Sequence, residues 1–264
     1  MDCLILLGMI RQLRILILLL VLLGVAVPAA WYHYKLWSWK TPIVVALIPI
    51  AADDHPGTRA WLQRLGADDF VPVEQFFSRE ASRYGFHLLR PITLQWRDPV
   101  DSLPPDIPEQ RGVLDMILWS LRFRWWAWQN TPQYGFEPAD LTLFLLYRTP
   151  VHNVEFSHSY ALRKTRAGVV KAFAGRPWQG RNRVVLVHEL LHLFGASDKY
   201  DLATGKPLFP QGYADPDQQP LYPQHMAEIM AGRRAISPHR VVMAEGLHQV
   251  LIGPVTAVEM GWRE

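Results

Sequence analysis

One short stretch limits the possible folds and functions of this chain more than any other. Its polar residues recur at helical spacing and are followed by a glycine. It runs from His188 to Asp198 with the sequence HELLHLFGASD. Residues four apart project from one face of a helix, so His188 and His192 lie one turn apart and can share one metal ion. Gly195 can adopt the left-handed conformation that ends a helix, since it has no Cβ. The chain then turns, and the carboxylate of Asp198 can return to the two imidazoles.

These side chains predict a catalytic zinc site. Zn²⁺ binds imidazole nitrogen at about 2.0–2.1 Å, and a catalytic site combines three protein ligands with an open fourth position. Glu189 directly follows the first histidine, where it can accept a proton from water instead of binding the metal. The sequence around these residues is apolar, both at residues 184–187 and between the polar members of the motif. We therefore expect a buried helix, with His188, His192 and Asp198 as ligands and Glu189 as general base.

The pattern HExxHxxGxxD resembles that of the zincin metallopeptidases, and of their metzincin-like branch in particular. Most metzincins have a third histidine at the last position, whereas a minority, the snapalysin-like enzymes, have an aspartate, as this chain does at Asp198. By motif the resemblance covers the second half of the chain, and in the first half it rests on the order of elements. It implies zinc-dependent hydrolysis of peptide bonds in a peptide or protein substrate, by an endopeptidase in preference to an exopeptidase.

The resemblance also implies a methionine turn beneath the metal, downstream of the motif. The sequence EIMAG at residues 228–232 is the candidate, with Met230 as the turn methionine. In the gluzincins the third ligand is instead a downstream glutamate on another helix, which makes Glu228 the alternative to Asp198. Both hypotheses keep the two histidines and the zinc ion.

Residues 1–40 predict a membrane anchor that is separate from the fold. Two basic residues, Arg11 and Arg14, precede an apolar run at residues 15–30. The run is short against the roughly 20 residues of a spanning helix, but the aromatic residues that follow it would extend it into the membrane interface. A cleaved signal peptide is the alternative, which those aromatic residues and Pro28 disfavour. We expect a single-pass membrane protein whose residues 41–264 lie on the periplasmic or extracellular side.

Composition narrows the class of protein further. Half of the 264 residues are apolar, which is enough for one sizeable core or one domain with two lobes. The net charge of +3 gives no electrostatic case for nucleic acid as a partner. The only cysteine, Cys3, excludes an intrachain disulfide and a zinc site built from cysteines.

The order of apolar patterns predicts an α+β fold. Apolar runs at residues 41–50, 88–94 and 141–147 indicate strands, and residues 153–162 and 168–174 indicate a hairpin. Helical spacing predicts helices at residues 73–84, 112–129 and 255–262, and we also expect short helices at residues 58–65 and 237–247. With the resemblance, this order implies a zincin-like fold: a mixed twisted sheet with helices at residues 41–195, and a small irregular lobe at 196–264 that ends in a helix. The segment 153–162 is the candidate edge strand for binding an extended substrate.

The helix at residues 112–129 has two interpretations. Its apolar stripe predicts a face that covers the sheet. The residues of this stripe are Leu114, Ile117, Leu118, Leu121 and Trp125. The alternative is that its Trp- and Arg-rich end lies in the membrane surface, through Arg122, Arg124, Trp125 and Trp126. We favour the first interpretation.

Two further functions compete with a membrane-anchored zinc peptidase. One is a catalytically inactive zincin-fold scaffold or binding protein at the membrane. The intact Glu189 disfavours it, because a protein that has lost turnover commonly loses the general base. The other is a zinc hydrolase of a non-peptide amide, for which the sequence offers no carbohydrate-binding segment.

Overall fold

The computed structural model describes residues 2–108, 112–132, 138–150 and 159–263, and it divides the chain into the units Met1–Lys40 and Thr41–Glu264. The first unit is one helix, α1 (Asp2–Ser38). Its part Arg11–Ser38 is long and apolar enough to cross a membrane. At about 1.5 Å per residue these 28 residues exceed a hydrocarbon core of about 30 Å, because the helix continues through the aromatic residues after the apolar run.

The second unit is built on a five-stranded sheet. Its strands are β1 (Ile43–Ala51), β2 (Ile92–Trp96), β3 (Leu141–Arg148), β4 (Tyr160–Leu162) and β5 (Ala167–Phe173). They lie in the order β2-β1-β3-β5-β4, in which β4 runs antiparallel to β5 and the other pairs are parallel. The central β1 and β3 are buried almost throughout, which explains their continuous apolar sequences. The predicted mixed sheet is confirmed, although the strand expected at 88–94 begins only after Pro91, which has no N–H for the ladder.

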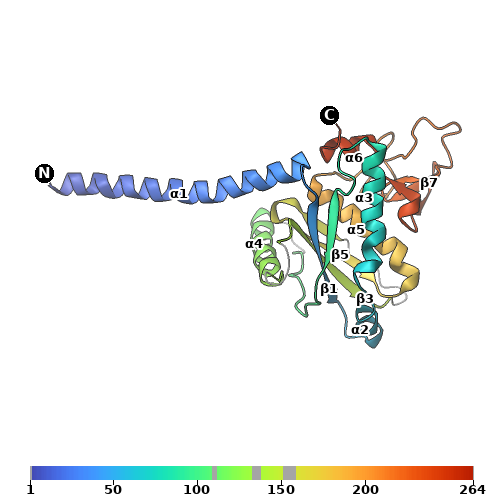
Figure 1. Ribbon diagram of the computed structural model, residues 1–264, viewed down its shortest axis with the longest axis horizontal. Helices are drawn as coiled ribbons and strands as arrows, with labels where there is room; N and C mark the ends of the chain where they lie inside the picture. The colour runs from blue at the N-terminus through green and yellow to red at the C-terminus, as the bar shows by residue number, and fades with distance from the viewer. Residues whose placement is uncertain (1, 109–111, 133–137, 151–158, 264) are drawn as a thin grey trace. The chain divides into compact units, whose positions relative to one another are not determined.

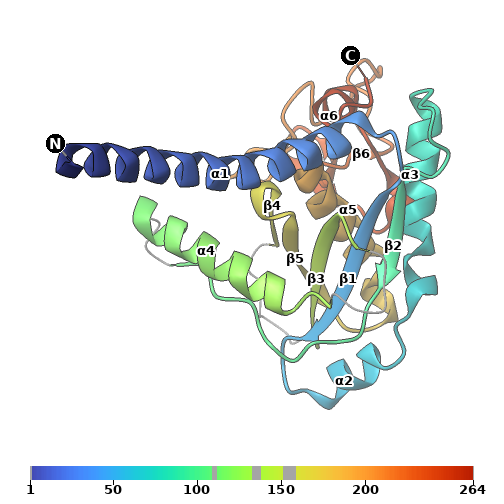
Figure 2. The same ribbon diagram turned by 60° about the vertical axis from the view of Figure 1, so that its left-hand side comes forward.

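Helices cover both faces of this sheet (Figures 1 and 2). On one face lies α4 (Val113–Gln129), and on the other lie α3 (Val71–Arg83) and α5 (Gln179–Phe194), while the short α2 (Pro56–Leu62) follows β1. The alternation of side chains along β5 explains this arrangement. Ala167 and Val169 belong to the core beneath α4, whereas Val170 and Ala172 lie beside Leu186 of α5.

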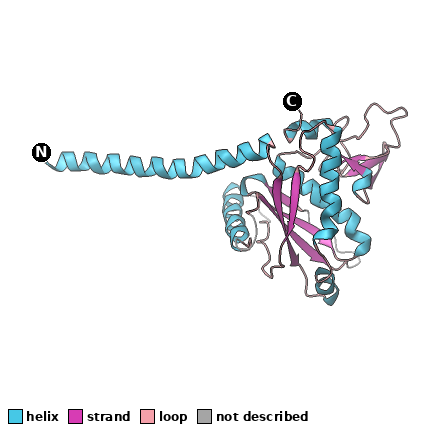
Figure 3. Cartoon of the chain, in the orientation of Figure 1, coloured by secondary structure: helices cyan, strands magenta, loops and turns pink. Residues whose placement is uncertain are grey.

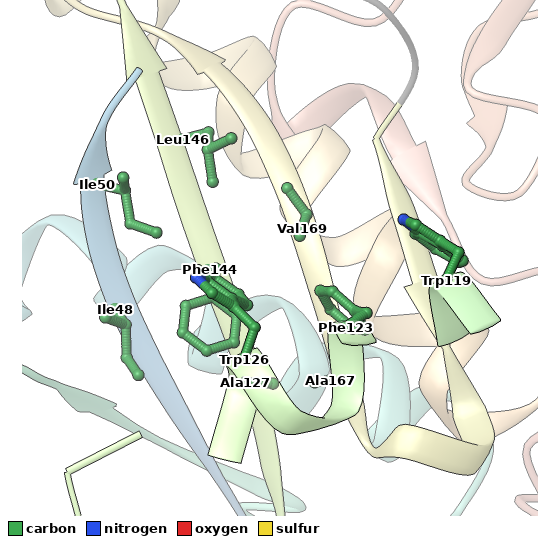
Figure 4. Close-up of a cluster of buried hydrophobic side chains, with 10 residues drawn as sticks. All are labelled: Ile48, Ile50, Trp119, Phe123, Trp126, Ala127, Phe144, Leu146, Ala167 and Val169. Carbon is green, nitrogen blue, oxygen red and sulfur yellow. The ribbon is translucent and has the colours of Figure 1, made fainter. Parts of the chain in front are cut away.

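The core beneath α4 corrects one prediction (Figure 4). The side chains that α4 contributes are aromatic or small, namely Trp119, Phe123, Trp126 and Ala127, and they lie against β1, β3 and β5. The stripe expected to cover the sheet, from Leu114 to Trp125, is instead exposed. The helix is apolar around most of its circumference, so spacing alone did not decide which face lies inward. The indole N–H groups of the buried face also find acceptors, Pro105 O at 3.1 Å and Ser102 Oγ at 2.8 Å.

The chain after the motif forms short elements beside the sheet (Figure 3). The strand β6 (Ala227–Glu228) pairs with β9 (Val250–Leu251), β7 (Arg233–Ser237) pairs with β8 (Arg240–Met243), and α6 (Pro254–Glu259) follows. The helix expected at 237–247 is wrong, because the Ser237 hydroxyl accepts the next backbone N–H groups in a hairpin turn. The terminal helix is shorter than expected, and it buries Thr256, which donates a hydrogen bond to Glu228.

Candidate metal centre

The helix α5 carries both histidines and is fixed at its two ends. Near its start the Asn182 side chain accepts the N–H of Phe173 and donates to its carbonyl, at 3.1 and 2.8 Å, which ties the helix to the end of β5. At its end Gly195 has a φ of 107°, and the N–H of Ala196 bonds to Leu191 O at 3.0 Å. The helix therefore ends at the predicted glycine, and the chain turns back toward the histidines.

The three predicted ligands come together. Nε2 of His188 lies 3.2 Å from Nε2 of His192, and Oδ1 of Asp198 lies 3.2 Å from each of these nitrogens. Two ligand atoms about 2.0–2.1 Å from one ion at a tetrahedral angle would lie about 3.3 Å apart. The spacing of the three donors thus fits one small tetrahedral cation, and we call them the His–His–Asp trio.

The outer nitrogens of both imidazoles contact backbone carbonyls. Nδ1 of His188 lies 3.1 Å from Ile229 O, and Nδ1 of His192 lies 2.8 Å from Ala196 O. A carbonyl only accepts, so each Nδ1 carries the proton and each Nε2 turns a lone pair toward the trio. Within the described part of the chain, the buried Oδ1 of Asp198 accepts no hydrogen bond. Two lone pairs and a carboxylate oxygen at such distances could hold a cation between them.

Electrostatics at the trio favours positive charge. Burial acts to lower the pKa of His192, but the carboxylate of Asp198 and the carbonyl of Ala196 outweigh it, so this pKa is raised. Burial acts to raise the pKa of Asp198, but the two histidines outweigh it and hold the pKa well below the usual range of a carboxyl group. Both shifts result from the close approach of one carboxylate to the two imidazoles, and this arrangement stabilises positive charge at the trio.

The loop that carries Asp198 is held by an ion pair between a buried ammonium and a partly exposed carboxylate, which the sequence did not reveal. The ammonium of Lys199 is almost fully buried, at 2% exposure, and lies 2.8 and 2.9 Å from the carboxylate oxygens of Glu259. It also donates to the Ser197 carbonyl at 2.9 Å, and its own backbone N–H bonds to Met230 O at 3.0 Å. Lys199 therefore joins the loop to α6 and to the turn after β6.

That turn contains the predicted Met230, and the alternative ligand Glu228 directly precedes it at the end of β6. Met230 is fully buried, and the carbonyl of its neighbour Ile229 is the group that holds His188. Glu228 does not join the trio. Its Oε2 accepts the N–H groups of Met230 and Ala231, and its Oε1 accepts from Gly253 and Thr256, at 2.6 to 3.1 Å. The structure thus places Glu228 as a support of the turn, a role that no spacing in the sequence indicates.

Glu189 lies on the same helix as the histidines and lines the same cleft. Its side chain is buried, and in the described residues nothing donates a hydrogen bond to its Oε2. Burial raises the pKa of Glu189, against the effect of the neighbouring histidines. A desolvated carboxylate with one unpartnered oxygen beside a cation site is suited to accept and return a proton.

The cleft at the trio has a volume of about 870 Å³ and lies along β4. Tyr160 and Ala161 of β4 line it, which matches the expected edge strand at 153–162, although residues 153–158 lie outside the described residues. Among the described residues that line the cleft, the carboxylates are Glu189 and Asp198, and the cations are Arg163, Lys171, Arg181 and Arg233. The lining beyond the metal centre therefore carries basic side chains, of which Arg181 pairs at 3.5 Å with Glu245, a residue outside the lining.

Fold and site together define a mixed α/β unit with a candidate metal centre of two histidines and one aspartate. Comparison of the sequence with protein-family models and with curated proteins finds no match.

Proposed function

We propose that this protein is a membrane-anchored zinc peptidase that cleaves internal peptide bonds. The observation that carries the proposal is the His–His–Asp trio, with donor atoms 3.2 Å apart and Glu189 beside it in one cleft. A zincin-like fold agrees with the mixed sheet, its antiparallel edge strand β4 and the helix that carries HExxH. The helix α1 would hold the second unit at the membrane, on the periplasmic or extracellular side, as expected of a signal anchor.

His188, His192 and Asp198 would hold the zinc ion, and the carbonyls of Ile229 and Ala196 fix the two imidazoles. Zinc in such a site supplies a Lewis acid that polarises a carbonyl group and lowers the pKa of water toward about 7. Glu189 accepts a proton from the attacking water and delivers it to the leaving amine. Its pKa, which burial raises, favours the first of these transfers, because a more basic carboxylate accepts a proton more readily.

The substrate would bind as an extended chain along β4. This strand ends the sheet on the side of the cleft, so its outer backbone groups can pair with a peptide. Such pairing uses hydrogen bonds to the backbone of the substrate and does not depend on its side chains. It can therefore hold a substrate whose cleaved bond lies within the chain as well as one whose cleaved bond lies near an end. The cationic walls favour acidic side chains next to the cleaved bond.

Replacement of the general base tests the proposal. Glu189→Gln should retain zinc, measured by elemental analysis, and lose at least about 100-fold in the rate of peptide cleavage. Asp217→Asn, at an exposed carboxylate outside the cleft, serves as the matched control and should cleave normally. If the zinc-loaded protein cleaved no member of a diverse peptide library, or if Glu189→Gln cleaved as fast as the unaltered protein, the proposed function would be wrong.

A further inference from the structure

The helix α4 has a second apolar face, which the described residues of its own unit leave exposed. Seven side chains on it are between 51% and 78% exposed, namely Val113, Leu114, Ile117, Leu118, Leu121, Trp125 and Trp128. At about 100° per residue they lie on one side of the helix, opposite the aromatic residues that cover the sheet. We call these seven residues the outer face of α4.

The outer face is one contiguous apolar surface, and it differs in this from the single exposed apolar residues that are common on protein surfaces. A helix that covers a sheet needs one apolar side, and α4 already supplies it through Trp119, Phe123 and Trp126. Contiguous exposed apolar surface marks a site of contact with a membrane or a protein partner. The outer face is therefore a contact surface for something outside the sheet.

The composition of the outer face favours a lipid bilayer over a protein as its partner. Its two tryptophans, Trp125 and Trp128, lie with ring centroids 5.1 Å apart, and all its other members are aliphatic. Arg122 and Arg124 lie near its two margins, where a guanidinium can reach lipid phosphates while the apolar side chains enter the acyl region. Tryptophan and arginine beside leucine and isoleucine are typical of helices that lie in a membrane interface.

The chain contains a helix that can anchor it to a membrane. The helix α1 is long and apolar enough to cross a bilayer and ends at Ser38, and the second unit begins at Thr41. A bilayer spanned by α1 would thus lie within a few residues of the second unit. Tethering of this kind raises the effective concentration of the lipid surface, so even a modest apolar face would bind it.

We propose that the outer face of α4 inserts into the interfacial layer of the phospholipid bilayer, as a second membrane contact of this chain. The proposal stands apart from the peptidase activity, since it rests on no residue of the cleft. Because α4 and α5 lie on opposite faces of the sheet, insertion of α4 leaves the face that carries α5 turned away from the lipid (Figure 2). Of the residues expected from sequence to reach the membrane, Trp126 lies inward and takes no part.

Lipid-specific fluorescence quenching tests the proposal on the full chain. In a Cys3→Ser background, Leu118→Cys would carry an environment-sensitive nitrobenzoxadiazole probe, and Ser82→Cys on α3, also exposed, would carry the same probe as the matched control. Both proteins are reconstituted in vesicles of phosphatidylcholine and phosphatidylglycerol, with and without bromine on the acyl chains. We expect bromolipid to quench the probe at 118 at least twofold more than the probe at 82.

Two results would overturn the proposal. If the probe at 118 is quenched by aqueous iodide as strongly as the probe at 82, and not by bromolipid, then the outer face lies in water. If neither quencher reaches the probe at 118, then protein covers the face, either another segment or a second copy of the chain. Circular dichroism of both labelled proteins shows that the substitutions leave the fold intact.

Discussion

His188 and His192 face each other with their rings nearly perpendicular, at 89°, and their Nε2 atoms 3.2 Å apart. Neither ring can turn away freely, because each Nδ1 is held by a carbonyl from a different part of the chain, Ile229 and Ala196. With the protons on the Nδ1 atoms, the two Nε2 lone pairs face each other and repel. A cation relieves that repulsion, so metal binding and folding are coupled at this site.

Zinc should therefore stabilise the protein. A ligand that binds only the folded state, present at 100 times its Kd, adds about 2.7 kcal/mol to the free energy of unfolding. For a unit of this size we expect the Tm to rise by about 5–10 °C. Asp198→Ala should lose most of the rise, whereas His239→Ala, at an exposed histidine outside the cleft, should keep it. Differential scanning calorimetry with zinc and with chelator measures both, and an equal rise in Asp198→Ala would remove Asp198 from the ligand set.

The trio itself was predictable from the sequence, because its geometry is local. Residues four apart on a helix share a face whatever surrounds them, and a glycine at the helix end turns the chain within three residues. The strands β1 and β3 were predictable for a similar reason, because continuous apolar runs of their length are typical of buried strands. These features need no knowledge of distant parts of the chain.

The supporting groups were not predictable, because they depend on contacts between distant segments. Lys199 meets Glu259 across 60 residues, and Glu228 meets Thr256 across 28 residues. Nothing in the sequence near Lys199 shows that its ammonium is buried. The prediction of the inward face of α4 was wrong for another reason. This helix has two apolar faces, and the shape of the sheet surface decides which of them is buried.

The Lys199–Glu259 pair should contribute strongly to stability. Removal of one member of a fully buried ion pair costs about 3–5 kcal/mol, and that is the upper limit here because the Glu259 side chain is 27% exposed. Burial acts to raise the pKa of Glu259, but Lys199 and Ser197 outweigh it, so the pKa is lowered. A group with a lowered folded pKa contributes stability above its unfolded pKa of about 4.3, and this contribution is lost as the pH falls through the folded value.

We therefore expect Glu259→Gln to lower the free energy of unfolding at pH 7 and to have less effect at pH 3. Urea denaturation at the two pH values measures the difference. Lys199→Met should lower the stability at pH 7 as well, and it should weaken zinc binding because the loop of Asp198 loses its tie to α6. An equal loss of stability for Glu259→Gln at both pH values would show that the ion pair is not its cause.

Glu228 should act as a positioning residue for His188. Its two carboxylate oxygens accept four hydrogen bonds, and the amide nitrogen in Glu228→Gln would leave at least one donor without an acceptor, at a cost of about 1–3 kcal/mol each. The turn would shift and move the Ile229 carbonyl, and loss of such a support lowers metal affinity about 10- to 100-fold. Ile229→Val is the matched control, because it removes a methylene from the same buried turn and keeps the carbonyl. Competition with a zinc chelator should show weaker binding in Glu228→Gln alone, and equal affinities would assign Glu228 to folding only.

The cationic walls of the cleft should set a preference for acidic peptides. Arg233 is exposed and lines the cleft, and among the described lining residues the carboxylates belong to the metal centre. An exposed ion pair contributes about 0.2–1 kcal/mol, so Arg233→Ala should raise KM for a glutamate-containing peptide by about 1.4- to fivefold. Since Arg233 would bind the substrate and its transition state alike, kcat should not change.

Two comparisons separate this effect from a general loss of activity. A peptide with glutamine in place of glutamate should bind Arg233→Ala and the unaltered protein equally well. Arg240→Ala, on β8 of the same hairpin but outside the cleft, should leave both peptides unaffected. The preference should also weaken with added salt, because exposed charges are screened within about 8 Å at physiological ionic strength. A preference that survives in Arg233→Ala and in high salt would mean that acidic residues are recognised by something other than the charge of the cleft.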